Sequence, residues 1–201
     1  MLYEAQFRNP AGAGKLIQAI RDMDLPELWI MEICGTHTMS IAKAGLRQIL
    51  PPHIHLISGP GCPVCVTPSG VMDEVLRISQ LPNVTITTYG DLLRVPGSVP
   101  GDNLQRRSAQ GADVRMVYSP MDSLDMAEQE PDREFIFLGV GFETTAPGTA
   151  IAVQEAKARG RKNFSLLSLL KRTEPAMRAI IESDDFNVSG FLCPGHVATI
   201  L

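Results

Sequence analysis

The sequence predicts an α/β fold in which helices flank parallel strands. Seven short runs of mostly apolar, often β-branched residues alternate with amphipathic segments, and breaks of Gly, Pro, Ser or Thr separate them. The runs are nearly continuous, as expected for strands that are covered on both faces. Strand–helix–strand repetition of this kind predicts a parallel sheet with right-handed crossovers. We expect the strands at residues 28–33, 54–57, 84–89, 114–118, 135–140, 164–170 and 188–192.

Local signals mark the helices between these runs. Pairs of a capping residue and a proline predict three helix starts, and they are Asn9-Pro10, Thr67-Pro68 and Ser119-Pro120. The first helix should end near Met23. Gly111 and Gly160 fit the left-handed residue that often follows a helix.

The most polar interruption between elements lies at residues 130–133. We therefore expect two Rossmann-like lobes, one over residues 1–130 with most of the cysteine motifs and one over residues 131–201, with a cleft at the carboxyl ends of the strands. A single sheet, or part of a barrel, is the alternative. The chain stops soon after its last predicted strand, so the second lobe is expected to be incomplete, in a fragment or a naturally short form.

Composition narrows the classes of function. The chain has 201 residues, 44% of them hydrophobic and 20% charged, which is enough to bury a sizeable core. Its net charge is −4 and it carries no basic stripe, which argues against a nucleic-acid partner. It has neither a signal peptide nor an apolar run of membrane length, so we expect a cytoplasmic protein. In that reducing compartment, its four cysteines are expected to serve in catalysis, metal binding or the core rather than in disulfides.

Four chemically distinctive motifs follow predicted strands. They occupy residues 34–37 (CGTH), 59–65 (GPGCPVC), 139–145 (GVGFETT) and 193–196 (CPGH). In open α/β sheets, ligands bind at the carboxyl ends of the strands, where such loops converge. The sequence therefore predicts a functional site at these ends.

Cys62 and Cys65 are three residues apart, which is close enough for a disulfide. They precede a predicted helix whose N-terminal dipole would stabilise a thiolate, so a redox-active pair is the leading interpretation. Gly61 would allow the backbone to approach a ligand closely. The alternative is that both cysteines are small buried residues.

Cys34 and His37 form a second candidate pair. A cysteine thiolate could ligate iron, zinc or copper, and His37 could be a further ligand or a base. A cysteine at a strand end can also be an ordinary core residue. Together with Cys62 and Cys65, this pair also matches a Cys₃His zinc site, which is the main structural alternative.

Glu143, Thr144 and Thr145 precede another predicted helix and make a turn suited to an anion. Glu143 could instead be a solvated helix cap. The glycines nearby are too few for a dinucleotide fingerprint, and no P-loop is present, which argues against nucleotide binding.

The four motifs, in this order, resemble the signature of the HypD family of hydrogenase maturation factors. The resemblance covers essentially the whole chain but only about the first half of the family's usual length. It implies a scaffold on which the Fe(CN)₂CO unit of [NiFe]-hydrogenase is assembled, rather than a freestanding enzyme. The implied partners are a HypC-like small chaperone, whose N-terminal cysteine would share the iron, and a HypE-like cyanide donor.

The resemblance also implies roles for individual residues. Cys34 would be the iron ligand, and Cys62 and Cys65 would be the redox pair, with His37 and Glu143 beside the reacting groups. Cofactor-binding residues around Cys34 are expected to be Gly35, Thr36, Gly61, Thr144 and Thr145.

Two features depart from the family's pattern. Family members carry a [4Fe-4S] cluster on a C-terminal segment that this chain does not contain, which leaves the source of electrons open. Cys193 matches no functional position of the family and is expected in the core, or to be reactive if it is exposed. Two other classes therefore stay open, a thiol–disulfide oxidoreductase and a zinc-stabilised binding module.

Overall fold

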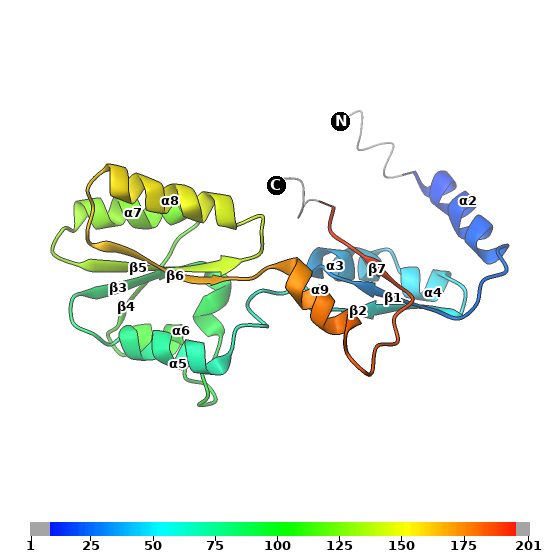
Figure 1. Ribbon diagram of the computed structural model, residues 1–201, viewed down its shortest axis with the longest axis horizontal. Coiled ribbons are helices and arrows are strands. Elements are labelled where there is room, and N and C mark those ends of the chain that lie inside the picture. The colour runs from blue at the N-terminus through cyan, green and yellow to red at the C-terminus, as the bar shows by residue number, and fades with distance from the viewer. Residues whose placement is uncertain (1–8, 196–201) are drawn as a thin grey trace. The chain divides into compact units, whose positions relative to one another are not determined.

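Parallel strands flanked by helices make up the fold, as the sequence predicts. The computed structural model describes residues 9–195, and within that range seven strands form two fully parallel sheets (Figure 1). Each predicted strand is confirmed to within two residues at either end. One sheet has three strands in the order β2-β1-β7, and the other has four in the order β4-β3-β5-β6.

The two sheets belong to two compact units. The described part of the first unit runs from Asn9 to Gly61 and returns at Ala179–Pro194, and the second unit comprises mainly Cys62–Arg178. The expected boundary at 130/131 is therefore wrong. Strands on both sides of it pair in one sheet, as in the register Val84↔Glu134. The polar break at 130–133 is only the turn that leads into β5.

The first unit is built around its three-stranded sheet. Its strands are β1 (Leu28–Glu32), β2 (Ile54–Ser58) and β7 (Gly190–Leu192), and its helices are α2 (Pro10–Arg21), α3 (Gly35–Lys43) and α4 (Leu46–Ile49). The predicted start of the first helix is confirmed, because the Asn9 side chain accepts a hydrogen bond from the Gly12 N–H at 3.1 Å. Arg47 connects α4 to the sheet, since its Nε donates to the Leu56 carbonyl at 3.2 Å.

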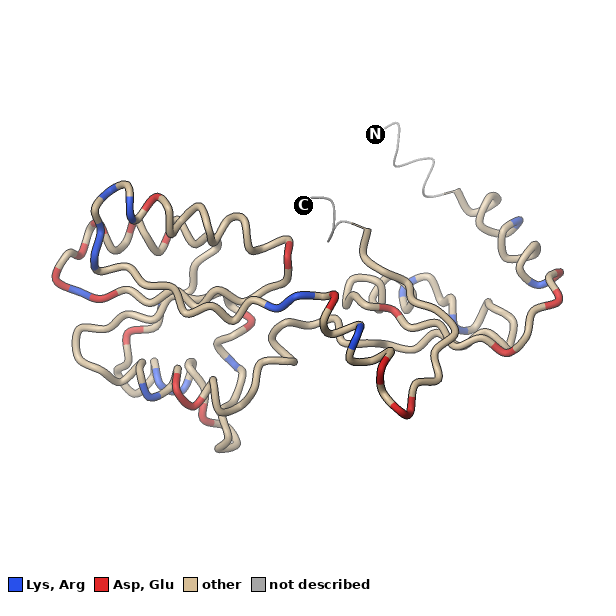
Figure 2. Tube along the Cα trace, viewed as in Figure 1, with Lys and Arg blue, Asp and Glu red and all other residues tan. Residues whose placement is uncertain are grey.

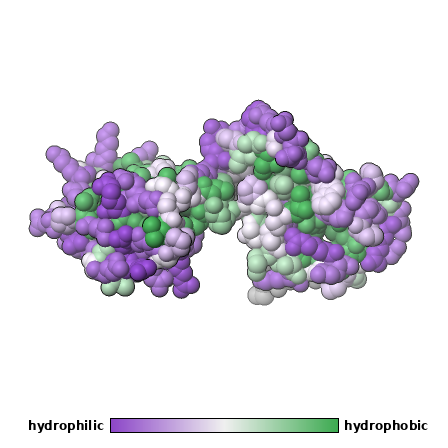
Figure 3. Space-filling model, turned by 90° about the horizontal axis from the view of Figure 1, so that it is seen from below, coloured by the Kyte–Doolittle hydropathy of each residue, from purple (hydrophilic) through white to green (hydrophobic). Residues whose placement is uncertain are grey.

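The second unit has a larger sheet with helices on both sides. Its strands are β3 (Val84–Thr88), β4 (Asp113–Met116), β5 (Glu134–Gly141) and β6 (Phe164–Leu170). Its helices are α5 (Ser69–Ile78), η1 (Gly90–Arg94), α6 (Leu104–Ala109), α7 (Pro120–Gln129), α8 (Ala146–Ala158) and α9 (Thr173–Ile181). The last residues of α9, from Ala179 on, belong to the first unit. In Figure 1, α7 and α8 cover one face of the sheet, and α5 and α6 cover the other. Fully buried residues from α5 and from the central strands, such as Met72, Ile86 and Leu138, form its core. Figure 3 shows that hydrophilic residues dominate the visible surface of this unit.

Most helix starts and ends lie where the sequence signals predict them. Ser119 and Asp122 form a capping box at the start of α7, and Gly111 and Gly160 have positive φ angles of 105° and 65°. The Thr67 cap is wrong, because α5 begins only at Ser69 and the Thr67 hydroxyl donates instead to the Pro63 carbonyl at 2.9 Å. No helix within residues 9–195 is both long and apolar enough to cross a bilayer.

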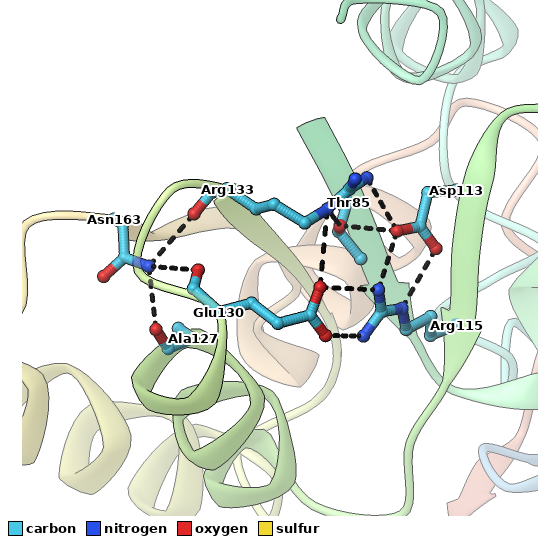
Figure 4. Close-up of polar contacts among 7 residues, drawn as sticks. All are labelled: Thr85, Asp113, Arg115, Ala127, Glu130, Arg133 and Asn163. Atoms are coloured by element: carbon cyan, nitrogen blue, oxygen red, sulfur yellow. Dashed lines mark hydrogen bonds and ion pairs between the residues drawn. The ribbon is translucent and has the colours of Figure 1, made fainter. Parts of the chain in front are cut away.

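An ion-pair network closes the amino-terminal edge of the four-stranded sheet (Figure 4). Arg115 lies between Asp113 and Glu130, while Arg133 reaches Asp113 at 2.7 Å and donates from Nε to Thr85 Oγ1 at 3.0 Å. Charged residues are concentrated at this end of the unit in Figure 2. In the sequence, the polar residues 130–133 suggest a domain boundary. In the structure, Glu130 and Arg133 instead form ion pairs with residues of β4, within one unit.

The same edge holds a half-buried amide and two carboxyl groups with perturbed pKa values. The Asn163 amide donates to the carbonyls of Ala127, Glu130 and Arg133. Burial acts to raise the pKa of Asp113, but hydrogen bonds from Arg115 and Thr85 outweigh it, so the pKa lies below its ordinary value. The pKa of Glu130 is also lowered, chiefly by its hydrogen bonds with Arg115.

Replacing Asp113 by Asn should destabilise the protein in a pH-dependent way. A carboxyl group with a depressed native pKa stabilises the fold above its unfolded pKa, near 4, and loses this effect as the pH falls through the native value. We expect Asp113→Asn to lower the free energy of unfolding at pH 7 by about 1–2 kcal/mol, and the deficit to shrink below pH ~4. Urea unfolding between pH 7 and 3 measures this, with the exposed neighbour variant Asp132→Asn as control. A deficit independent of pH, or one shared by the control, would contradict the network's role.

Candidate functional site

Cys34 lies where β1 gives way to α3. It is the N-cap residue of this nine-residue helix, with extended backbone angles (φ −160°, ψ 127°). Its carbonyl accepts hydrogen bonds from the N–H groups of His37 and Thr38 at 2.9 and 3.2 Å, whereas its half-buried side chain makes no capping hydrogen bond within the described structure. The thiol therefore stands at the positive end of a helix and remains available to a ligand.

The loop after β2 packs directly against this position. β1 and β2 are parallel neighbours, and Gly59 N–H donates to the Glu32 carbonyl at 2.8 Å. At Gly61, a Cβ atom would lie 2.8 Å from the Gly35 nitrogen and 3.0 Å from the Cys34 carbonyl carbon. Only a residue without a side chain permits this approach. In the described structure Gly61 thus approaches the Cys34 loop. Its predicted close approach to a ligand stays a prediction.

A buried carboxylate, which the sequence analysis missed, holds the same edge together. Glu32 is only 2% exposed, and its Oε1 accepts from Ser58 Oγ at 2.6 Å and from Arg47 Nη2 at 3.2 Å. Its Oε2 is buried and has no hydrogen-bond partner among the described residues. The signal was visible in the sequence, because Glu32 is the one charged residue in the apolar run at 28–33 and lies two positions before Cys34.

The other residues of the CGTH motif form the first turn of α3. Gly35 and Thr36 are exposed, and His37 is half-buried. The His37 Nδ1 atom is buried and makes no hydrogen bond within residues 9–195. Both Cys34 and His37 could therefore contribute a ligand or a polar contact at this edge.

Cys62 and Cys65 open the second unit on a tight turn. Both are free thiols, and the Cys65 N–H donates to Cys62 Sγ at 3.3 Å. The Val66 N–H also donates to the Cys62 carbonyl at 3.3 Å. Because α5 starts only at Ser69, the predicted support from its dipole does not reach Cys62, since that effect fades beyond the first turn of a helix. The group that does contact Cys62 Sγ is the Cys65 N–H of the turn itself.

The two thiols differ in environment. Cys62 is half-buried and Cys65 is exposed. The pKa of Cys65 is raised, first by its side-chain hydrogen bond to Cys62 and then by burial and by repulsion from the Cys62 charge. These contacts favour the protonated form of Cys65.

Glu143 is a helix cap, although for a different helix than the sequence suggests. Its carboxylate accepts from the Thr173 N–H at 2.6 Å and from Thr173 Oγ1 at 2.9 Å, at the start of α9. Burial acts to raise the pKa of Glu143, but the Thr173 hydrogen bonds outweigh it, so the pKa is lowered. Thr144 is exposed, and Thr145, the N-cap residue of α8, packs so closely on Gly141 that a Cβ there would clash with it.

Cys193 follows β7, beside β1 in the first unit. It is exposed, so its expected place in the core is wrong. The pairing of β7 with β1 brings it to the same edge of the sheet as Cys34. His196, from the same predicted motif, lies outside the described residues.

The four side chains of the alternative Cys₃His zinc site fall in two units. Cys34 and His37 belong to the first unit, and Cys62 and Cys65 belong to the second. Within each unit, the described part of the chain brings no group of three or more His, Cys, Asp or Glu side chains together as a metal site.

The fold and the site define an α/β protein that carries cysteines on loops around its strand ends. Comparison with known proteins shows which family of this class the chain matches. The HypD family model, described as "Hydrogenase formation hypA family", matches residues 12–201. The chain belongs to the HypD family.

Curated relatives agree with this assignment. The chain is 44% identical over 209 residues to "Hydrogenase maturation factor HypD" of Escherichia coli (strain K12), with 100% of the chain and 55% of that protein covered. It is 46% identical over 209 residues to the protein of the same name from Rhizobium leguminosarum bv. viciae (100% and 54% covered), and 43% identical over 208 residues to that from Rhodobacter capsulatus (100% and 55% covered). The chain thus spans about half the length of these relatives.

Gly61→Ala should disturb the Cys34 loop. The added methyl group would press on the backbone of Cys34 and Gly35, which cannot move aside as a flexible side chain would. We expect the free energy of unfolding to fall by about 1–3 kcal/mol. The matched control is Gly70→Ala in α5, where a Cβ would meet nothing within 4 Å. Equal stabilities of the two variants in urea unfolding would contradict the proposed packing.

Glu143→Gln should weaken the start of α9. The amide retains an acceptor but loses the negative charge that favours a helix N-terminus, so we expect a loss of about 0.5–1 kcal/mol at pH 7. Because the lowered pKa of Glu143 makes its contribution fade as the pH falls below the unfolded value, the two proteins should converge near pH 3. Thermal unfolding at both pH values measures this. Asp184→Asn, at an exposed position in the turn after α9, is the control, and a deficit that persists at pH 3 would argue against a charge effect.

Proposed function

We propose that this chain is the cysteine-bearing part of a scaffold that assembles the Fe(CN)₂CO unit during [NiFe]-hydrogenase maturation. Iron is the cargo of this scaffold, and Cys34 is its ligand from this chain. Membership of the HypD family supports the general role. The main structural support is the position of Cys34. It is the N-cap residue of α3, and the Gly61 backbone packs against it.

The chemistry of the cargo suits Cys34. Iron that carries cyanide and carbon monoxide is stabilised by a soft, electron-donating thiolate. A thiol must lose its proton to bind a metal, and the N-terminus of α3 favours the resulting negative charge. The remaining ligands come from outside this chain: cyanide, carbon monoxide and the thiolate of a HypC-like small chaperone. His37, in the same helical turn, would lie beside the cargo.

Cys62 and Cys65 form the proposed redox pair. Oxidation of the two thiols to one disulfide releases two electrons and two protons, so the pair can supply or store electrons during assembly. Its spacing and the contact of the Cys65 N–H with Cys62 Sγ support this role. We propose that a [4Fe-4S] cluster, as the family resemblance implies, supplies the electrons from outside this chain.

The proposed partners follow from the same role. A HypC-like small chaperone shares the iron with Cys34, and a HypE-like protein delivers cyanide. Gly35, Thr36 and Gly61 would border the cargo on the side of the Cys34 loop. Thr144 and Thr145, on the loop after β5 in the second unit, are proposed to contact a partner protein. The cytoplasm is the proposed location.

Iron analysis of variants tests the assignment of Cys34. The chain is co-expressed with a HypC-like chaperone and the other maturation proteins, purified without oxygen and analysed for iron. We expect Cys34→Ser to lose the iron that the wild type carries and Cys193→Ser, at the end of the neighbouring strand, to retain it. Equal iron in both variants would contradict the assignment. Full maturation activity of Cys34→Ser would instead favour a thiol–disulfide oxidoreductase, which needs only Cys62 and Cys65.

A further inference from the structure

We propose that Cys62 is the attacking sulfur of the pair and Cys65 the resolving sulfur, in exchange with a disulfide or dithiol of another protein. This inference rests on the proposed redox role and adds an order to it. It concerns the two thiols of the turn at the start of the second unit, which differ in the groups that surround them.

Backbone geometry distinguishes the two sulfurs. Cys62 Sγ accepts the N–H of the residue three positions on, Cys65, at 3.3 Å, as a serine or aspartate side chain does at a helix N-cap. A sulfur that accepts an N–H hydrogen bond is stabilised more as a thiolate than as a thiol. The Thr67 hydroxyl, which donates to the Pro63 carbonyl at 2.9 Å, ties the same turn together.

The neighbouring thiol adds to this difference. Cys65 hydrogen-bonds through its side chain to Cys62, which keeps the proton on Cys65 and raises its pKa. The thiolate is the nucleophile in disulfide exchange, so the sulfur that ionises first attacks first. Exposure alone would predict the opposite order, because Cys65 is exposed and Cys62 is half-buried.

The reaction balances in two steps. The Cys62 thiolate attacks one sulfur of the partner's disulfide, which forms a mixed disulfide and releases one partner thiolate. Cys65 then gives up its proton and attacks Cys62 Sγ, which forms the Cys62–Cys65 disulfide and releases the second partner thiolate. Two thiols of this chain are oxidised, and one disulfide of the partner is reduced. In the reverse direction, a partner dithiol attacks Cys62 Sγ of the disulfide and reduces it.

Competitive alkylation of the reduced full chain tests the order. The wild type is treated at pH 7 with less than one equivalent of iodoacetamide, unfolded, and labelled with an isotopically heavy form. Fragment ions that separate the two positions then give both labelling rates, with exposed Cys193 as an internal reference. We expect Cys62 to react faster than Cys65 by roughly fivefold or more. A faster or equal rate at Cys65 would overturn the proposed order.

Trapping of the mixed disulfide separates this inference from the proposed function. With oxidised glutathione, Cys65→Ser should accumulate a stable adduct on Cys62, and Cys62→Ser should form its adduct at least several-fold more slowly. The reverse result would overturn the order but leave the redox pair intact, provided that the oxidised wild type contains the Cys62–Cys65 disulfide. Failure of the wild type to form that disulfide would overturn both the order and the redox role.

Discussion

The close approach of two backbones at the end of β1 is the constraint on which the candidate site depends. Gly61 packs on the nitrogen of Gly35 and on the backbone of Cys34, and no larger residue fits there without displacing the start of α3. The parallel pairing of β1 with β2 makes this contact possible, because it brings the ends of both strands to one edge. Glu32 reinforces it through Ser58 and Arg47. A thiol held on such a rigid support is suited to binding a ligand in a fixed geometry.

The ion-pair network and the candidate site occupy different parts of the chain. In the second unit, the network around Asp113 and Arg115 closes the amino-terminal edge of the sheet, where charges are paired and no reactive thiol lies in the described structure. In the first unit, Cys34 and Cys193 follow the carboxyl ends of neighbouring strands. Open α/β sheets place ligands at the carboxyl ends of their strands. Glu143 shows that a residue at such an end can also serve the fold, since it caps α9.

The strands and most helix starts could be predicted because they depend on local patterns. Apolar runs located all seven strands, and the capping signals at Asn9 and Ser119 were correct. The domain boundary failed because strand order is not local. A polar turn looks the same whether it joins two units or two strands of one sheet. The return of residues 179–194 to the first unit, where β7 joins its sheet, is not signalled by any local sequence pattern. Glu32 was missed because its partners, Ser58 and Arg47, come together only in the folded chain.

Infrared spectroscopy can show whether the Cys34 edge carries iron with cyanide and carbon monoxide. The chain is purified without oxygen in complex with a HypC-like chaperone, after co-expression with the other maturation proteins. A full-length relative treated in the same way is the positive control. We expect cyanide and carbonyl stretching bands in the complex of the wild-type chain. A complex that shows no such bands, while the full-length relative does, would contradict it.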